Sequence, residues 1–238
     1  MANTPKQRVD RRAAVEEMRR AERAAARRRM IVLATVTGVV ALGLIAAVTV
    51  PAIMGGNSAP ARGAIAAIGV PAAQAGCADP ITQPATGVND HVEPGVTVRY
   101  DTAPPAFGKH DGQYITDPRH FYSPRDRPSV EKLVHSLEHG YTIVWYDDTV
   151  SGDQLQALRD LAVRMPKEAN PGRWFIVAPW AAQDVANRGS FPKGTHVAMT
   201  HWGATDGVRQ YCGKVSGAAV AAFVAKHPAS DAPEAGGV

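Results

Sequence analysis

The sequence contains few cysteines and lacks the motifs of several common enzyme classes. Cys77 and Cys212 are the only cysteines in 238 residues, and no Cys-x-x-Cys pair indicates a thioredoxin-type redox site. The chain also has no glycine-rich nucleotide-binding loop and no Gly-x-Ser-x-Gly nucleophile motif. These absences leave nucleotide-dependent and disulfide-exchange chemistry without support.

Charged residues are nearly absent from one long part of the chain. Between Arg29 and Asp79 only Arg62 carries a charge, and residues 30–54 form an uncharged, strongly apolar run of 25 residues. As a helix this run would be about 37 Å long, which exceeds the hydrocarbon core of about 30 Å. The run predicts one transmembrane helix. A cleaved signal peptide is the alternative, but its apolar region is usually much shorter.

The basic residues are concentrated before this apolar run. Residues 1–29 hold 10 of the 26 Lys and Arg residues and 4 of the 22 Asp and Glu residues, so the rest of the chain is slightly acidic. The positive-inside rule then predicts a single-pass protein of the cell membrane, with a cytoplasmic N-terminus and an extracytoplasmic C-terminal domain. The main domain has no basic excess, so we expect no nucleic-acid partner.

Composition divides the remainder of the chain into three parts. Residues 55–89 are rich in Gly, Ala and Pro and are predicted to be a linker; 90–228 form the globular domain; 229–238 form a disordered tail. Outside the cytoplasm an even pair of cysteines indicates a disulfide, so we expect Cys77 to pair with Cys212. Two unrelated buried thiols are the alternative.

Apolar periodicity predicts seven elements in the order β-α-β-α-β-β-α. This order is typical of an α+β (or α/β) layered domain with a mixed four-stranded sheet, here placed behind one N-terminal transmembrane helix. The strands are predicted at 96–100, 141–146, 174–178 and 196–202, and the helices between Asp126 and Gly140, at 153–165 and at 216–226.

The first of these helices ends in His135-Ser136-Leu137-Glu138-His139. Asp126 is its predicted N-cap, and Gly140 its predicted stop. His135 and His139 are four residues apart, so both imidazoles lie on one face, roughly opposite the apolar stripe of the helix. The two rings should therefore face either solvent or a second layer of the domain that brings further ligands.

Several kinds of chemistry fit this pattern. Its H-x-x-E-H spacing matches inverted zincins, in which two histidines hold zinc and the glutamate polarises water. A zincin needs a further ligand, which is usually a downstream carboxylate. A broader interpretation is a transition-metal site for zinc or copper in which other histidines join. The alternative is that the helix histidines make only structural hydrogen bonds. The downstream carboxylates are Glu168, Asp184, Asp206 and Glu234, and the other candidate histidines are His91, His110, His120, His196 and His201.

Segments on both sides of the histidine motif are similar to a known family. The segments are His91-Val92, Tyr100 to Pro105, Gly108 to His110, Gly112 to Tyr114, Val134 to Gly140 and Thr200 to Gly203. They resemble a bacterial, membrane-anchored family catalogued as domain of unknown function 3105. The resemblance covers about residues 85–225 and implies topology and fold, but no established activity.

The sequence as a whole favours a membrane-anchored extracytoplasmic domain that binds a transition metal, zinc or copper, rather than an enzyme. We expect His135, His139, His110 and His91 to be ligands, and Glu138 to orient an imidazole or activate a metal-bound water. A non-enzymatic envelope interaction domain with a structural histidine helix is the alternative. A metal-dependent hydrolase is a third hypothesis, and it requires a carboxylate near both helix histidines.

Overall fold

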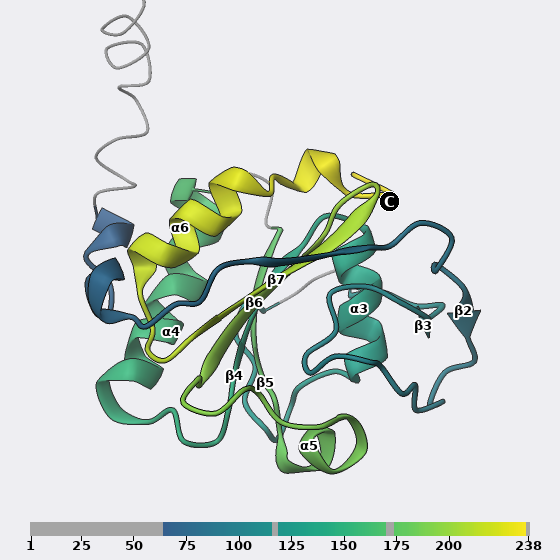
Figure 1. Ribbon diagram of the computed structural model, residues 1–238, viewed down its shortest axis with the longest axis horizontal. Coiled ribbons are helices and arrows are strands. Elements are labelled where there is room, and N and C mark those ends of the chain that lie inside the picture. The colour runs from purple at the N-terminus through teal and green to yellow at the C-terminus, as the bar shows by residue number, and fades with distance from the viewer. Residues whose placement is uncertain (1–63, 116–118, 170–173, 237–238) are drawn as a thin grey trace, which may run out of the picture. The chain divides into compact units, whose positions relative to one another are not determined.

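The computed structural model describes residues 64–115, 119–169 and 174–236, which form an α+β domain around a mixed sheet (Figure 1). The strands are β1 (Ile81–Pro84), β2 (His91–Val92), β3 (His110–Asp111), β4 (Thr142–Tyr146), β5 (Phe175–Pro179), β6 (Val197–Trp202) and β7 (Asp206–Cys212). The α-helices are α3 (Val130–Glu138), α4 (Gly152–Arg164), α5 (Ala182–Arg188) and α6 (Gly217–Lys226). Shorter helical turns lie at Ala72–Gln74, Met165–Ala169 and Ala229–Asp231.

The main sheet has five strands in the order β1-β7-β6-β4-β5. β4 and β5 are parallel and are connected through α4, whereas the β1/β7, β7/β6 and β6/β4 pairs are antiparallel. The prediction of a mixed sheet is confirmed, but the predicted number of four strands is wrong. Every residue of β4, β5 and β6 is buried, as expected for strands covered on both faces.

Helices cover both faces of the sheet (Figure 1). The sheet therefore separates the core into two apolar clusters, one on each face. Val144 and Tyr146 of β4 pack with α4 and α6, whereas Ile143 and Trp145 of the same strand pack with α3. The alternation follows from the two-residue period of a strand, which sends successive side chains to opposite faces. The histidine-bearing helix thus lies on the face opposite α4 and α6.

Helix α3 begins after a serine N-cap and ends before a glycine. The hydroxyl of Ser129 accepts a hydrogen bond from the backbone N–H of Lys132, so Ser129 and not Asp126 is the N-cap. Gly140 follows the helix with φ +97°, which confirms it as the stop. A Cβ at Gly140 would lie 2.5 Å from the carbonyl oxygen of Ala229, so glycine also lets the C-terminal segment approach.

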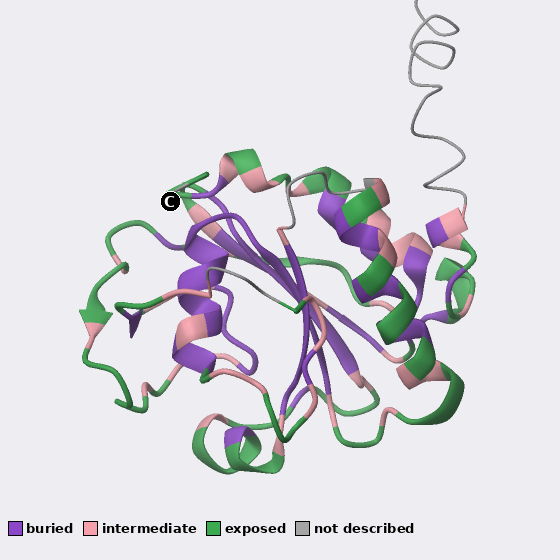
Figure 2. Ribbon diagram, turned by 180° about the vertical axis from the view of Figure 1, so that it is seen from behind, coloured by how far each residue is buried: buried purple, intermediate pink, exposed green. Residues whose placement is uncertain are grey.

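A second layer covers the outer face of α3, which is mostly buried (Figure 2). This layer is the two-stranded parallel ribbon of β2 and β3, in which His91 lies opposite His110. Because the apolar stripe of α3 faces the sheet, its opposite face, with both histidines, is turned toward the ribbon. Of the two surroundings that the sequence left open for the helix histidines, solvent or a second layer, the structure shows the second layer.

The N-terminal and C-terminal parts of the domain differ most from prediction. Residues 96–100 form no strand, and the sheet instead gains β1, inside the predicted linker, and β7, which the sequence did not indicate. The predicted disordered tail also has structure, because Asp231 accepts a backbone hydrogen bond from Ala204. Order therefore extends beyond the predicted domain limits of 90 and 228.

Among the residues that the structure describes, no helix has the length and apolar character needed to cross a bilayer. The predicted transmembrane segment, residues 30–54, and the basic segment before it lie outside the described residues. The predicted disulfide is confirmed, because Cys77 and Cys212 are bonded to each other. It ties the segment before β1 to the end of β7, and so secures the edge strand of the sheet.

Replacement of both cysteines by serine should destabilise the domain. The disulfide joins residues 135 positions apart, and removal of such a cross-link gives the unfolded chain more conformational freedom, at a cost of about 2–5 kcal/mol. Urea unfolding of Cys77→Ser/Cys212→Ser should show the loss, and reductant should lower the wild-type midpoint in the same direction. A midpoint that neither change moves would contradict a structural role for the bond.

Candidate metal centre

Four side chains converge between the β2/β3 ribbon and helix α3. They are His91, His110, His135 and Glu138, and one ligand atom from each lies within 4.8 Å of the others. Parallel pairing places His91 beside His110, with ring centroids 4.8 Å apart. The ring of His135 lies 4.6 Å from that of His110 and 5.0 Å from that of His91. Imidazole nitrogens and a carboxylate are ligands that suit zinc and other divalent transition metals.

Backbone carbonyls orient two of these imidazoles in the same way. Nδ1 of His110 donates to the carbonyl of Gly108 at 2.8 Å, and Nδ1 of His135 donates to the carbonyl of Asp111 at 2.6 Å. The proton of each neutral ring is then on Nδ1, which leaves the Nε2 lone pair free to bind a cation. Metal-binding histidines commonly have this arrangement, in which a partner of the second nitrogen fixes the tautomer.

The carboxylate of Glu138 is buried and has no hydrogen-bond donor. Its side chain is 1% exposed, and neither of its oxygens has a hydrogen-bond partner among the described residues. Nε2 of His110, whose side chain is 0% exposed, lies 3.0 Å from Oε2 of Glu138, at ion-pair distance, but it too has no hydrogen-bond partner among the described residues. A buried charge costs several kcal/mol unless it is both paired and hydrogen-bonded, so this position favours a cation.

The surroundings favour the metal-binding form of both helix residues. Burial lowers the pKa of the His135 imidazole to about 4, so the ring is neutral near pH 7. Burial raises the pKa of the Glu138 carboxyl. The His110 side chain 3.0 Å away, and the positive charge that His135 and His139 carry when protonated, lower that pKa by more, so it lies below its ordinary value. A neutral imidazole and an ionised carboxylate are the forms that bind metal.

His139, the second predicted ligand on the helix, lies beside this group but not within it. Its Nε2 is 3.0 Å from Nε2 of His135, and the two rings are stacked with centroids 4.9 Å apart. Tyr114 covers it, with a centroid distance of 4.2 Å. The Glu234 carboxylate also lies 4.0 Å from Nε2 of His139. In the sequence, Glu234 was only one of several downstream carboxylates that could serve as a zincin ligand.

The other histidine candidates lie elsewhere. His120 bonds to the carbonyl of Phe175, and His196 is paired with Asp147. His201 is buried, and its strand neighbours Val197 and Met199 belong to the cluster that contains α4 and α6. The remaining zincin carboxylates do not approach the helix histidines in any described ion pair.

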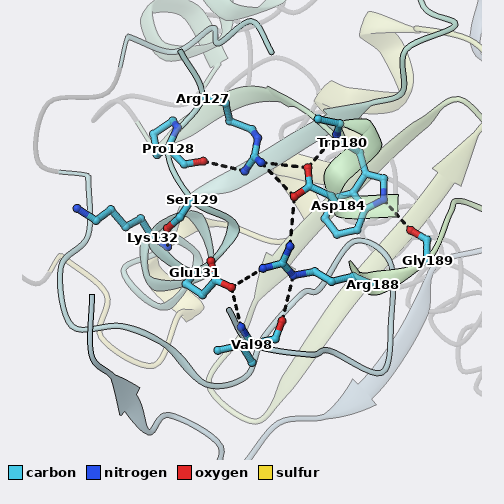
Figure 3. Close-up of polar contacts among 11 residues, drawn as sticks. Val98, Arg127, Pro128, Ser129, Glu131, Lys132, Trp180, Asp184, Arg188 and Gly189 are labelled. Carbon is cyan, nitrogen blue, oxygen red and sulfur yellow. Dashed lines mark hydrogen bonds and ion pairs between the residues drawn. The ribbon is translucent and has the colours of Figure 1, made fainter. Parts of the chain in front are cut away.

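A buried network of charges fixes the other end of helix α3 (Figure 3). Arg188 of α5 forms ion pairs with Glu131 of α3 and with Asp184, and Asp184 also pairs with Arg127. All four side chains are buried, and the carboxylate of Glu131 also accepts the backbone N–H of Val98. Each carboxylate therefore has a positive partner, unlike Glu138. Asp184, a possible zincin ligand in the sequence, is a structural residue here.

Arg188→Met should destabilise the protein strongly, because it leaves two buried carboxylates with fewer positive partners. The expected loss of unfolding free energy is about 3–5 kcal/mol. Arg164→Met is the matched control, since Arg164 also forms an i,i+4 pair, with Glu168, but at the surface, where less than about 1 kcal/mol is expected. Equal effects of the two substitutions in urea unfolding would contradict the importance of the network.

His227 lies at the end of α6 near His201, and its Nε2 is buried without a hydrogen-bond partner in the described part of the chain. Burial, and to a smaller extent the charge of His201, lower the pKa of His227 below its ordinary value. In the unfolded chain this imidazole takes up its proton near pH 6.5, whereas the folded protein resists protonation until lower pH. Stability should therefore be complete above pH 6.5 and decrease as the pH falls below it.

His227→Phe should weaken this pH dependence, because phenylalanine keeps the ring contact with Phe223 but does not titrate. The difference in melting temperature between pH 7.5 and pH 5.5 should be smaller in the variant than in the wild type. His196→Phe, which changes a half-exposed histidine, is the control. The interpretation fails if both variants keep the wild-type difference.

Comparison with known proteins gives one match. The family model described as "Protein of unknown function (DUF3105)" matches residues 91–238, a range that contains all four converging side chains. No curated protein and no solved structure matches the chain.

Proposed function

Because the chain belongs to the DUF3105 family of proteins of unknown function, we propose a function from the site itself: the domain binds a divalent transition metal. His110, His135 and Glu138 would be the buried ligands, and the exposed His91 would complete the set from the solvent side. Zinc and copper are the metals we propose. Both accept imidazole nitrogen and carboxylate oxygen, and four such ligands can form a tetrahedral zinc site.

The unsatisfied Glu138 carboxylate is the observation that carries this proposal. A purely structural carboxylate at 1% exposure would be expected to accept hydrogen bonds, as Glu131 does on the same helix. Nε2 of His110 and Nε2 of His135 lie 3.0 Å and 3.9 Å from Oε2 of Glu138, and the Nδ1 atoms of both rings donate to backbone carbonyls. The Glu138 oxygen and the two Nε2 atoms can therefore direct their lone pairs at one bound cation.

We further propose that this binding takes place outside the cytoplasm, in a domain tethered by residues 30–54. The apolar run and the basic residues before it support the tether. The Cys77–Cys212 disulfide supports an oxidising compartment, because such bonds rarely persist in the cytosol. The disulfide also removes both thiolates, so the proposed site must rely on nitrogen and oxygen ligands.

Metal content of the purified full-length chain tests the proposal. Wild-type protein, supplied with micromolar zinc or copper and then desalted, should retain about one equivalent, whereas His110→Ala/His135→Ala should retain little. Glu138→Gln keeps the size of the side chain but removes its charge, and it should weaken binding at least about tenfold. His196→Ala serves as control, since its imidazole pairs with Asp147 elsewhere. Absence of metal from the wild type would overturn the proposal.

A structural role for the histidines is the second candidate. The bond from Nδ1 of His135 to the carbonyl of Asp111 favours it, because this bond ties helix α3 to the ribbon without any ion, and Nδ1 of His110 is held locally by the carbonyl of Gly108. In that case His135→Ala lowers the melting temperature by the same amount with or without chelator. If the ion is part of the structure, chelator should lower the wild-type melting temperature and leave the variant unchanged.

A further inference from the structure

We infer that the metal reaches this site from the side of the C-terminal segment, through an outer position formed by His139 and Glu234. The inference rests on the proposed function, and it assigns these two residues to metal uptake and not to the final ligand set. The proposed ligand set of His91, His110, His135 and Glu138, called the inner position below, contains neither His139 nor Glu234 and does not explain their arrangement.

The C-terminal segment is held closely against the end of helix α3. The backbone N–H of Glu234 donates to the carbonyl of Glu138 at 3.0 Å, and the carbonyl of Glu234 accepts from Nδ1 of His139 at 3.3 Å. Gly140 permits this approach, because any side chain there would meet Ala229. These contacts fix the backbone of Glu234, while its side chain remains 53% exposed to solvent.

The imidazoles of His135 and His139 meet at this position. Their Nε2 atoms lie 3.0 Å apart, at hydrogen-bond distance, while Nδ1 of each ring lies 2.6 Å and 3.3 Å, respectively, from a backbone carbonyl oxygen. Two nitrogens bound to one ion at about 2.0–2.1 Å in a tetrahedron are about 3.3 Å apart. The observed spacing is close to that of two ligands of a shared cation.

His135 connects this outer position to the inner one. Its Nε2 lies 3.0 Å from Nε2 of His139 and 3.9 Å from Oε2 of Glu138. One nitrogen lone pair can bind only one ion, so His135 cannot serve both positions at once. An ion held by His139 and His135 can therefore pass to the inner ligands by exchanging His139 for Glu138 while His135 stays bound.

The Glu234 carboxylate supplies negative charge beside the outer position. It lies 4.0 Å from Nε2 of His139 and has no Lys or Arg in ion-pair distance among the described residues. By contrast, the Asp90 carboxylate, next to the exposed His91 in the chain, is neutralised by Lys109 at 3.3 Å. An unneutralised carboxylate raises the local concentration of cations, so a hydrated ion should be captured at Glu234.

Rapid-mixing kinetics with Cu²⁺ alone tests the route in the full-length chain, followed by tryptophan fluorescence. Trp202 is a suitable reporter, because its ring lies 5.7 Å from that of His110. Glu234→Gln and His139→Asn are the test variants; asparagine can keep the donor to the Glu234 carbonyl while it removes Nε2. Asp90→Asn is the matched control, since it removes an exposed carboxylate from the other side.

Glu234→Gln and His139→Asn should each slow the association of Cu²⁺ with the protein and its dissociation by the same factor, at least about threefold at low ionic strength. The dissociation constant for Cu²⁺ should then stay within about twofold of the wild-type value. Asp90→Asn should change neither rate. The route is overturned if both test variants associate at the wild-type rate, if Asp90→Asn is the slow variant, or if His139→Asn weakens equilibrium binding with an unchanged association rate. Failure of the wild type to bind Cu²⁺ or Zn²⁺ at all would instead overturn the proposed function.

Discussion

The constraint on which the site depends is the negative charge of Glu138, which is buried without a well-formed hydrogen bond among the described residues. A charge in such a place must be neutralised or compensated. Glu131 on the same helix shows the ordinary solution, with an arginine and a backbone N–H as its partners. Glu138 instead faces Nε2 of His110 and Nε2 of His135, whose Nδ1 atoms donate to backbone carbonyls. One divalent cation, as we propose, would satisfy all three groups.

The fold holds these groups in place from three directions. Helix α3 carries His135 and Glu138, and the buried charge network ties the beginning of that helix to α5. The β2/β3 ribbon brings His91 and His110 over the outer face of the helix, and the C-terminal segment closes its end. The polar face of α3, which carries His135, is expected to be exposed from the sequence pattern, yet α3 is mostly buried (Figure 2). This face is buried because the ribbon and the C-terminal segment pack against it and form the polar site there.

The sequence allowed the histidine helix, its stop at Gly140, the disulfide and the mixed sheet to be predicted, because each has a local signal. Strand β1 was missed because it is short, ends in Pro84 and lies in a Gly-, Ala- and Pro-rich stretch, as edge strands often do. In β7, polar residues such as Arg209 interrupt the apolar pattern, although Arg209 is buried through bonds to Gln83 and Tyr211.

The candidate ligands were partly predictable for the same reason. His135 and Glu138 share one helix, so spacing alone indicated their proximity. The partners His91 and His110 come from distant segments, and pairing of their two short strands, which no local pattern encodes, brings them together. Spacing also placed His139 in the ligand set, whereas the structure places it beside that set, next to Glu234. The Arg188 network was likewise invisible, because a buried charge and a solvated one look the same in a sequence.

The most direct measurement of the central claim is an anomalous difference map from crystals of the protein supplied with zinc, recorded on both sides of the zinc absorption edge. The account predicts one strong peak about 2.0–2.2 Å from Nε2 of His110, from Nε2 of His135 and from an oxygen of Glu138. A map without a peak between these residues, or with zinc only at surface positions such as His196 and Asp147, would contradict it.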